Sequence, residues 1–334
     1  MRLPYLYNQQ ILQKMKPSMR YQEGENFEDW QRRSRQKLIE LLGLPLEPCE
    51  ANYQVISEKD SSDHRRIYFQ FQSEPGYEVP CCLCIPKNLK SAVPVVICLQ
   101  GHSTGMHISL GEVKYPQDRE SIESGDRDFA LQAIKMGYCA ITVEQRCFGE
   151  CGGTENGPAC RDSSLIALLA GRTTIGERVW DVEKLIDLIE TGIFPEIDPQ
   201  RICCMGNSGG GTTAFFASCV DTRIGFSMPS CYVCTFYDSI VLRRHCECNY
   251  IPQICRYFDM GDLGGLIAPR PLVVVAGEKD PIFPKNGVEI TFRQIQSLYN
   301  AANASACCHL VIGPEGHRFY ADLAWPVMNP YLQS

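Results

Sequence analysis

The strongest constraint on the fold is the alternation of short apolar runs with segments of helical periodicity along most of the chain. Runs that are apolar on both faces are typical of parallel strands in a sheet covered on both sides, with the helical segments as the cover. The strand candidates are Arg66–Gln72, Val79–Ile85, Val93–Leu99, Tyr138–Val143, Arg201–Met205, Gly225–Met228, Leu272–Ala276 and His309–Ile312, and the helix candidates are Asp126–Met136, Ile175–Thr191, Gly211–Val220 and Lys285–Asn300. The sequence predicts one doubly wound α/β domain.

The first fifty residues have a different pattern. Phe27–Leu42 carries apolar residues near helical spacing, and Gly43 followed by Pro45 would end such a helix. We expect residues 1–50 to form an N-terminal helical extension and residues 51–334 to form the α/β domain.

Two stretches are too long to be simple connections. Residues 103–125 separate a strand from its helix, and residues 230–265 separate two strands. Both begin at the carboxyl end of a strand, which is where open α/β sheets bind ligands. We expect both to wall or cover a pocket.

Composition and charge exclude several classes of protein. The chain has 334 residues, and 44% of them are hydrophobic, which is enough for a large core. Its net charge of -7 offers no basic surface for a phosphate backbone, so we expect no nucleic-acid partner. No run approaches the ~18 apolar residues of a membrane span, so we expect no membrane partner either.

The 19 cysteines are an odd number spread along a long chain, which fits no disulfide framework. The N-terminal residues lack the apolar core of a secretory signal. Cysteines inside apolar runs, such as Cys98, behave as small hydrophobic residues. These features predict a reduced, cytoplasmic protein.

The clearest chemical motif is Gly-x-Ser-x-Gly at Gly206, Ser208 and Gly210, between a predicted strand and a predicted helix. A serine on such a sharp turn exposes its hydroxyl above the sheet, and the helix N-terminus behind it favours developing negative charge. The alternatives are a helix cap or a dinucleotide-binding loop, and the latter would need glycine in place of Ser208.

A nucleophilic serine needs a base and an acid, in the chain order Ser, acid, His. Among six histidines, His317 lies in a Gly- and Pro-rich loop just after the last predicted strand. Asp280 lies in the turn after the strand Leu272–Ala276, with Glu278 as its local competitor. The alternatives are a surface-loop histidine and an aspartate that only makes an Asp-Pro turn.

An oxyanion hole needs two N–H donors near the nucleophile. We expect one from Gly209, directly after Ser208, and the second from His102, which follows Gly101 in the loop after Val93–Leu99. Whether the His102 ring instead faces the substrate stays open.

Several short motifs together resemble the acetyl xylan esterase and dienelactone hydrolase branch of the α/β-hydrolases, over roughly residues 50–325. They are Gln100-Gly101-His102, Glu144-Gln-Arg146-Cys-Phe-Gly149-Glu150, Gly206-Asn-Ser208-Gly-Gly-Gly, Ala268-Pro-Arg-Pro-Leu, Gly277-Glu-Lys-Asp280-Pro-Ile-Phe-Pro and Glu315-Gly-His317. The resemblance implies an α/β-hydrolase fold with a mostly parallel sheet.

The resemblance also implies Ser208 as nucleophile, Asp280 as acid, His317 as base, and no cofactor. Gln100 departs from the pattern, because many relatives have histidine there. Serine in place of cysteine at the nucleophile position argues for ester hydrolysis rather than dienelactone chemistry.

Two further features have competing interpretations. Glu144 and Arg146 follow a strand and would either bind a substrate or form a buried ion pair that supports the loops. The cluster from Cys231 to Cys255, with His245 inside it, could bind zinc on spacing alone. Because cysteine is scattered throughout the chain, we attribute this cluster to chance and predict no metal site.

The sequence thus predicts a serine carboxylic-ester hydrolase that acts on short-chain, acetyl-type esters, including those of small molecules or saccharides. The alternatives are a peptidase or acyltransferase with the same triad, and an inactive or zinc-stabilised binding module. The oligomeric state, a homo-oligomer included, stays open.

Overall fold

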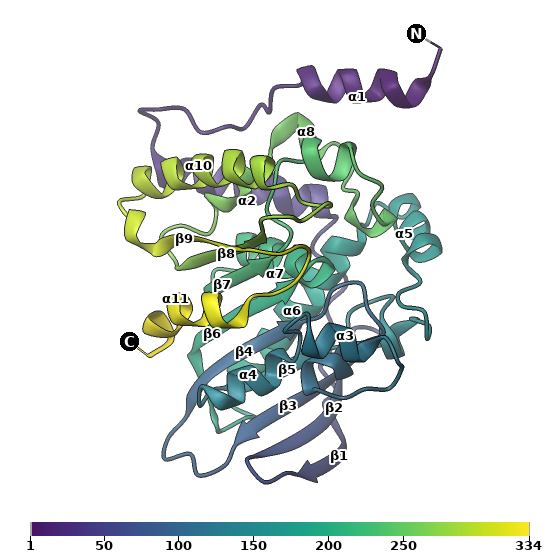
Figure 1. The fold of residues 1–334 in the computed structure, drawn as a ribbon, viewed down its shortest axis with the longest axis vertical. Helices are drawn as coiled ribbons and strands as arrows, with labels where there is room; N and C mark the ends of the chain where they lie inside the picture. Colours follow the sequence, from purple (N-terminus) through teal and green to yellow (C-terminus); the bar gives the residue numbers. More distant parts are fainter. Residues whose placement is uncertain (1, 334) are drawn as a thin grey trace.

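The computed structural model describes residues 2–333 and contains a nine-stranded sheet between layers of helices (Figure 1). The strands are β1 (Gln54–Asp60), β2 (His64–Glu74), β3 (Tyr77–Pro86), β4 (Val93–Leu99), β5 (Cys139–Val143), β6 (Ile197–Asn207), β7 (Ile224–Ser230), β8 (Leu272–Gly277) and β9 (Cys308–Gly313). Their order in the sheet is β1-β2-β3-β5-β4-β6-β7-β8-β9. The neighbours β1, β2, β3 and β5 pair antiparallel. The neighbours β5, β4, β6, β7, β8 and β9 pair parallel. The predicted α/β class is confirmed.

The helices lie on both faces of the sheet and around its edge. They are α1 (Pro4–Lys14), α2 (Phe27–Leu42), α3 (Asp118–Glu123), α4 (Phe129–Lys135), α5 (Cys160–Leu169), α6 (Thr174–Glu190), α7 (Gly209–Val220), α8 (Ile254–Tyr257), α9 (Met260–Gly264), α10 (Lys285–Ala301) and α11 (Ala321–Gln333). Short 3-10 or π turns are η1 (Met106–Leu110), η2 (Gly149–Cys151), η3 (Tyr237–Val241), η4 (Glu247–Asn249) and η5 (Ser305–Cys307). Every helix among the described residues is too short or too polar to cross a bilayer.

Alternate residues of the central strands feed two separate cores. In β4, Val95 and Ile97 belong to the core shared with α2, α6, α7 and α10, whereas Val96 and Cys98 belong to the core shared with α4 and α11. This division follows from the two-residue period of a strand. It explains why the strand sequences are apolar at every position.

The N-terminal segment is joined to the main body through α2. This helix begins after Asn26, whose side chain accepts a hydrogen bond from the Asp29 N–H, and it ends at Gly43 with φ 77°. Trp30 and Leu38 are fully buried in the larger core. By contrast, α1 has no buried residue and projects at the top of the view in Figure 1.

The two long stretches predicted from the sequence contain short helical pieces. Residues 103–125 include η1 and α3, and residues 230–265 include η3, η4, α8 and α9. A third such stretch, residues 144–173, follows β5 and carries η2 and α5. All three begin where a parallel strand ends, so they gather beyond the carboxyl edge of the sheet.

Candidate active site

Ser208 occupies the sharp turn between β6 and α7. Its backbone has φ 56° and ψ -120°, which a residue with a side chain adopts only under constraint. Its N–H donates to the carbonyl of Ser230 at the end of β7 (2.9 Å), and its carbonyl accepts from Thr212 N–H at the start of α7 (2.8 Å). This is the strand–turn–helix geometry of a nucleophile elbow.

The loop after β4 lies directly against this turn. A Cβ atom on Gly101 would lie 2.6 Å from the Asn207 carbonyl oxygen and 3.0 Å from Ser208 Cβ. A Cβ atom on Gly210 would collide with the carbonyl of Leu99. Glycine at both positions therefore allows the two backbones to approach each other closely.

Asp280 and His317 form a hydrogen-bonded pair. Asp280 follows β8, His317 follows β9, and His317 Nδ1 lies 2.8 Å from Asp280 Oδ2. The other carboxylate oxygen accepts from the N–H groups of Ile282 (2.8 Å) and Phe283 (3.1 Å). The Phe283 ring stacks on the His317 imidazole with centroids 5.8 Å apart, so the imidazole is held on two sides.

Asp280 is only 4% exposed. Burial alone would raise its pKa, but the hydrogen bond and charge of His317 and the two backbone N–H donors outweigh burial and lower the pKa below its usual value. An ionised Asp280 keeps the proton of His317 on Nδ1, which leaves Nε2 free to accept a proton.

Strand order brings these three residues to one edge of the sheet. β6 to β9 are consecutive neighbours, with Asn207 opposite Ser230 and Gly277 opposite Gly313. The thiol of Cys231, next to Ser230, lies within 4.8 Å of ligand atoms of both Asp280 and His317. Among the described residues no hydrogen bond joins Ser208 to His317; such bonds are often loose before substrate binds.

The two predicted oxyanion donors flank Ser208. Gly209 N–H begins α7, and a Cβ atom on Gly209 would lie 2.8 Å from Nδ1 of His102, so the His102 ring packs against it. Neither backbone N–H donates to another group within the described part of the chain. Both N–H groups are therefore free to bind an oxyanion.

Glu144 and Arg146 do not pair with each other. Arg146 donates to Asp181 (2.8 and 2.9 Å) and to Glu74 (2.7 Å). The Glu144 carboxyl instead accepts from Met106 N–H at 3.1 Å. Arg146 therefore forms buried ion pairs, as one of the two interpretations expected, but with Asp181 and Glu74 and not with Glu144.

Sequence reasoning gave no role to Gln145, although it lies inside one of the motifs. Its Nε2 donates to the Gln100 carbonyl (2.5 Å) and its Oε1 accepts from Thr213 (2.6 Å). It thus joins the loop after β4 to α7. Gln100 itself donates to Ser109 (2.7 Å) and to the Arg127 carbonyl (2.7 Å), so here its side chain supports the loop.

The suspected cysteine cluster divides into separate places. Cys231 lies beside Asp280 and His317, whereas Cys246 and Cys248 meet His102 and Cys160. All 19 cysteines are free thiols in the structure. Cys160 comes from the stretch after β5, and nothing in its sequence surroundings indicated that it would join the others.

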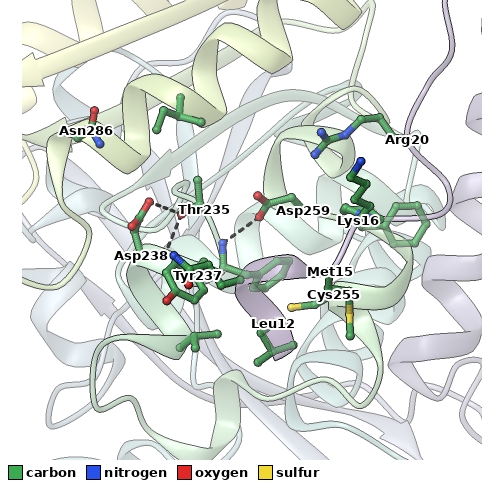
Figure 2. Close-up of a pocket in the computed structure, with 16 residues that line it drawn as sticks. Leu12, Met15, Lys16, Arg20, Thr235, Tyr237, Asp238, Cys255, Asp259 and Asn286 are labelled. Atoms are coloured by element: carbon green, nitrogen blue, oxygen red, sulfur yellow. Dashed lines mark hydrogen bonds between the residues drawn. The ribbon is translucent and has the colours of Figure 1, made fainter. Parts of the chain in front are cut away.

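Two clefts open near His102 and His317. One, of about 760 Å³, is bordered by His102, Cys160, His245 and Cys246, and the other, of about 380 Å³, is bordered by His317. Figure 2 shows a further cavity, of about 430 Å³, between Leu12 at the end of α1 and residues 235–238. None of the three candidate catalytic residues lines the cavity in Figure 2, so we assign it no part in the chemistry.

Comparison with known proteins agrees with this fold. The model of the abhydrolase family matches residues 5–192, more than half of the chain, and the protein therefore belongs to this family of α/β-hydrolases. A second model, of fungal glucuronyl esterases, matches residues 170–232. The "Putative hydrolase YtaP" of Bacillus subtilis (strain 168) is 24% identical over 289 residues, which cover 85% of this chain and 92% of that protein.

Solved structures share the architecture. The chain is similar to a "putative acetyl xylan esterase" of Bacteroides fragilis NCTC 9343, with a TM-score of 0.78 and 18% identity over 94% of this chain and 82% of the other. It is also similar to a glucuronoyl esterase of Solibacter usitatus, with a TM-score of 0.67 and 15% identity over 96% and 98% of the two chains. At these identities the likeness establishes the fold.

Proposed function

We propose that the protein hydrolyses carboxylic esters with Ser208 as the nucleophile and an acyl-enzyme as the intermediate. The observation that carries this proposal is the constrained turn at Ser208 on the same sheet edge as the buried Asp280–His317 pair. Family membership supports the reaction class.

The chemistry follows from the positions of the groups. Ser208 Oγ attacks the ester carbonyl carbon while His317 Nε2 takes the hydroxyl proton, and Asp280 stabilises the imidazolium. The N–H groups of Gly209 and His102 bind the oxyanion. When the tetrahedral intermediate collapses, the alcohol leaves with the proton from His317. A water molecule then repeats the sequence on the acyl-enzyme and releases the carboxylic acid.

For the substrate we propose short acyl groups of the acetyl type, including esters of sugars. The similar solved structures carry names of carbohydrate esterases, and these names differ in which half of the ester the sugar supplies. In an acetylated xylan the sugar is the alcohol, whereas in a glucuronoyl ester it supplies the acyl group. A panel of acetylated xylose, a methyl glucuronate ester and a matched acetamide separates these possibilities, and faster cleavage of the amide would favour a peptidase.

The direct test is turnover of p-nitrophenyl acetate by Ser208→Ala. We expect kcat/KM to fall at least about 10³-fold, because the residual site lacks the nucleophile. Ser57→Ala, in the exposed strand β1, is the control and should retain wild-type activity. A fluorophosphonate should modify Ser208 alone. Unchanged turnover in a folded Ser208→Ala protein would refute the assignment.

We further propose that the protein works in the reducing environment of the cytoplasm. The support is that all 19 cysteines are free, many inside the sheet. Cell fractionation followed by immunoblotting tests this, and recovery outside the cytoplasmic fraction would overturn it.

A further inference from the structure

Four potential metal ligands converge beside the candidate active site. His102 comes from the loop after β4, Cys160 from the first turn of α5, and Cys246 and Cys248 flank Glu247 in the η4 segment. The ligand atoms of all four lie within 4.8 Å of one another. Three segments that are far apart in the sequence therefore bring one imidazole and three thiols to a single point.

The spacing approaches that of a tetrahedral zinc site. With Zn–S near 2.3 Å and Zn–N near 2.0 Å, a tetrahedron has N···S edges of roughly 3.5 Å and S···S edges of roughly 3.8 Å. His102 Nε2 lies 3.2 Å from Cys248 Sγ and 4.0 Å from Cys160 Sγ. These two distances bracket the ideal edge, so small side-chain shifts are enough to enclose an ion.

A buried cation, Arg178, lies beside the thiols. Arg178 is 2% exposed, and its hydrogen-bond partners among the described residues include no carboxylate. Its guanidinium donates to the Arg146 carbonyl (2.8 Å) and to Cys160 Sγ (3.5 Å), and it lies 4.4 Å from the centre of the Phe148 ring. A buried, uncompensated cation is costly. Three thiolates, one neutral imidazole and Zn²⁺ carry a net charge of -1, which Arg178 would balance.

The orientation of His102 fits the same interpretation. Its Nε2 faces the thiols, while its Nδ1 lies against Gly209. The Phe148 ring packs on the imidazole, with centroids 5.2 Å apart. Coordination through Nε2 would leave the proton on Nδ1 and hold the ring in place beside the nucleophile turn.

We propose that His102, Cys160, Cys246 and Cys248 bind one zinc ion in a structural Cys₃His site. The ion joins the loop that carries the oxyanion donor to α5 and to the segment around η4. Binding releases the three thiol protons and involves no change of oxidation state. This site departs from the metal-free protein predicted from the sequence, and it does not depend on the proposed hydrolysis.

The second group of potential ligands does not form a comparable site. Cys231, Asp280 and His317 also lie within 4.8 Å of one another, but His317 Nδ1 and Asp280 already bind each other. The same thiol of Cys231 lies 3.2 Å from the Arg318 carbonyl. We therefore restrict the proposal to the cluster at His102.

The first measurement is the metal content of the untagged protein, purified with a reductant and without chelators. We expect about one zinc ion per chain. Cys248→Ser should bind zinc at least about tenfold more weakly. Cys255→Ser is the matched control, since Cys255 lies in the same region of the chain but outside the cluster, and it should retain the full zinc content.

Reconstitution of the wild-type protein gives a test that does not require the variant to fold. After removal of metal, Co²⁺ should produce the strong visible d–d bands and thiolate charge-transfer bands of a tetrahedral site, and Zn²⁺ should abolish them. Three outcomes would overturn the proposal: no zinc and no such cobalt spectrum, equal zinc loss in Cys255→Ser and Cys248→Ser, or a disulfide within the cluster in the reduced preparation.

Discussion

At the scale of single residues, Asp280 and Glu278 are two nearby carboxyl groups whose surroundings differ, and both are candidates for the acid of the triad. Both follow β8, but Asp280 is buried against His317, whereas Glu278 reaches the surface and pairs with Lys285 at 2.7 Å. The sequence predicted that the acid of the triad lies in this turn, with Asp280 preferred to Glu278. The register of β8 against β9 places Asp280 next to the loop that contains His317.

We expect Asp280→Asn to lower kcat by about 10³- to 10⁴-fold, because an amide can stabilise neither the imidazolium nor the tautomer that has Nε2 unprotonated. Glu278→Gln removes a carboxyl of the same turn and should leave kcat within about twofold of wild type. Steady-state kinetics with p-nitrophenyl acetate compare the two. A larger loss in Glu278→Gln would reverse the assignment.

Glu144 is a second buried carboxyl with an altered acidity. Burial raises its pKa to about 7, against the hydrogen bonds from Met106 and Glu150 N–H. Because the folded pKa is higher than the unfolded value of 4.5, this group contributes its full stability below pH 4.5. That contribution is lost as the pH rises toward 7, by up to about 1.4 kcal/mol for each pH unit.

Glu144→Gln should remove this component of the pH dependence. The free energy of unfolding of the wild-type protein, measured by urea titration, should fall between about pH 5 and about pH 8 relative to that of the variant. Glu47→Gln, on the exposed surface, should follow the wild-type curve. If the Glu144→Gln and wild-type curves stay parallel over this range, Glu144 is ionised throughout.

At the scale of elements, the sequence predicted those with a clear periodicity. The bounds Phe27–Leu42 and Val93–Leu99 are confirmed without change, because α2 has capping residues at both ends and β4 is a wholly apolar run. The predicted helix from Asp126 begins instead at Phe129, since Asp126 has φ 51°. β1 was missed because every residue in it is exposed at the sheet edge, so it has no apolar pattern.

The candidate functional residues also divide into those that the sequence could predict and those that it could not. Ser208, Asp280 and His317 could be proposed because each directly follows an apolar strand, and parallel strands align such positions. The cluster at His102 could not be proposed, because Cys160 and Arg178 meet the other members only through the packing of irregular stretches.

The packing of α2 leads to a prediction for this element. Leu38 is fully buried in the core that also contains residues of α6 and α7. We expect Leu38→Ala to lower the free energy of unfolding by about 2–5 kcal/mol through lost burial and a residual cavity. Gln36→Ala, on the exposed side of α2, should change it by less than about 0.5 kcal/mol. Equal, small effects would show that α2 is an appendage rather than part of the core.

At the scale of the whole molecule, a buried ionic network joins parts that the sheet alone does not connect. Glu74 at the end of β2 binds both Arg146 from the stretch after β5 and Arg172 before α6. Asp181 in α6 binds Arg146 with both oxygens, and Ser73 donates to it at 2.6 Å. The antiparallel and parallel halves of the sheet are thus held together by polar contacts as well as by the cores.

Arg146→Met tests this network and, at the same time, the idea that Arg146 binds substrate. Removing Arg146 leaves Asp181 buried without its cation and leaves Glu74 paired with Arg172 alone, which should lower the free energy of unfolding by about 3–5 kcal/mol. The matched control is Arg119→Met, whose exposed pair with Glu123 is worth less than about 1 kcal/mol. Urea titration measures both. If the Arg146→Met protein is folded, its KM for p-nitrophenyl acetate should stay close to that of the wild type. The guanidinium of Arg146 already binds Asp181 and Glu74, so we expect it to take no part in substrate binding. A raised KM with unchanged stability would instead make Arg146 a substrate-binding residue.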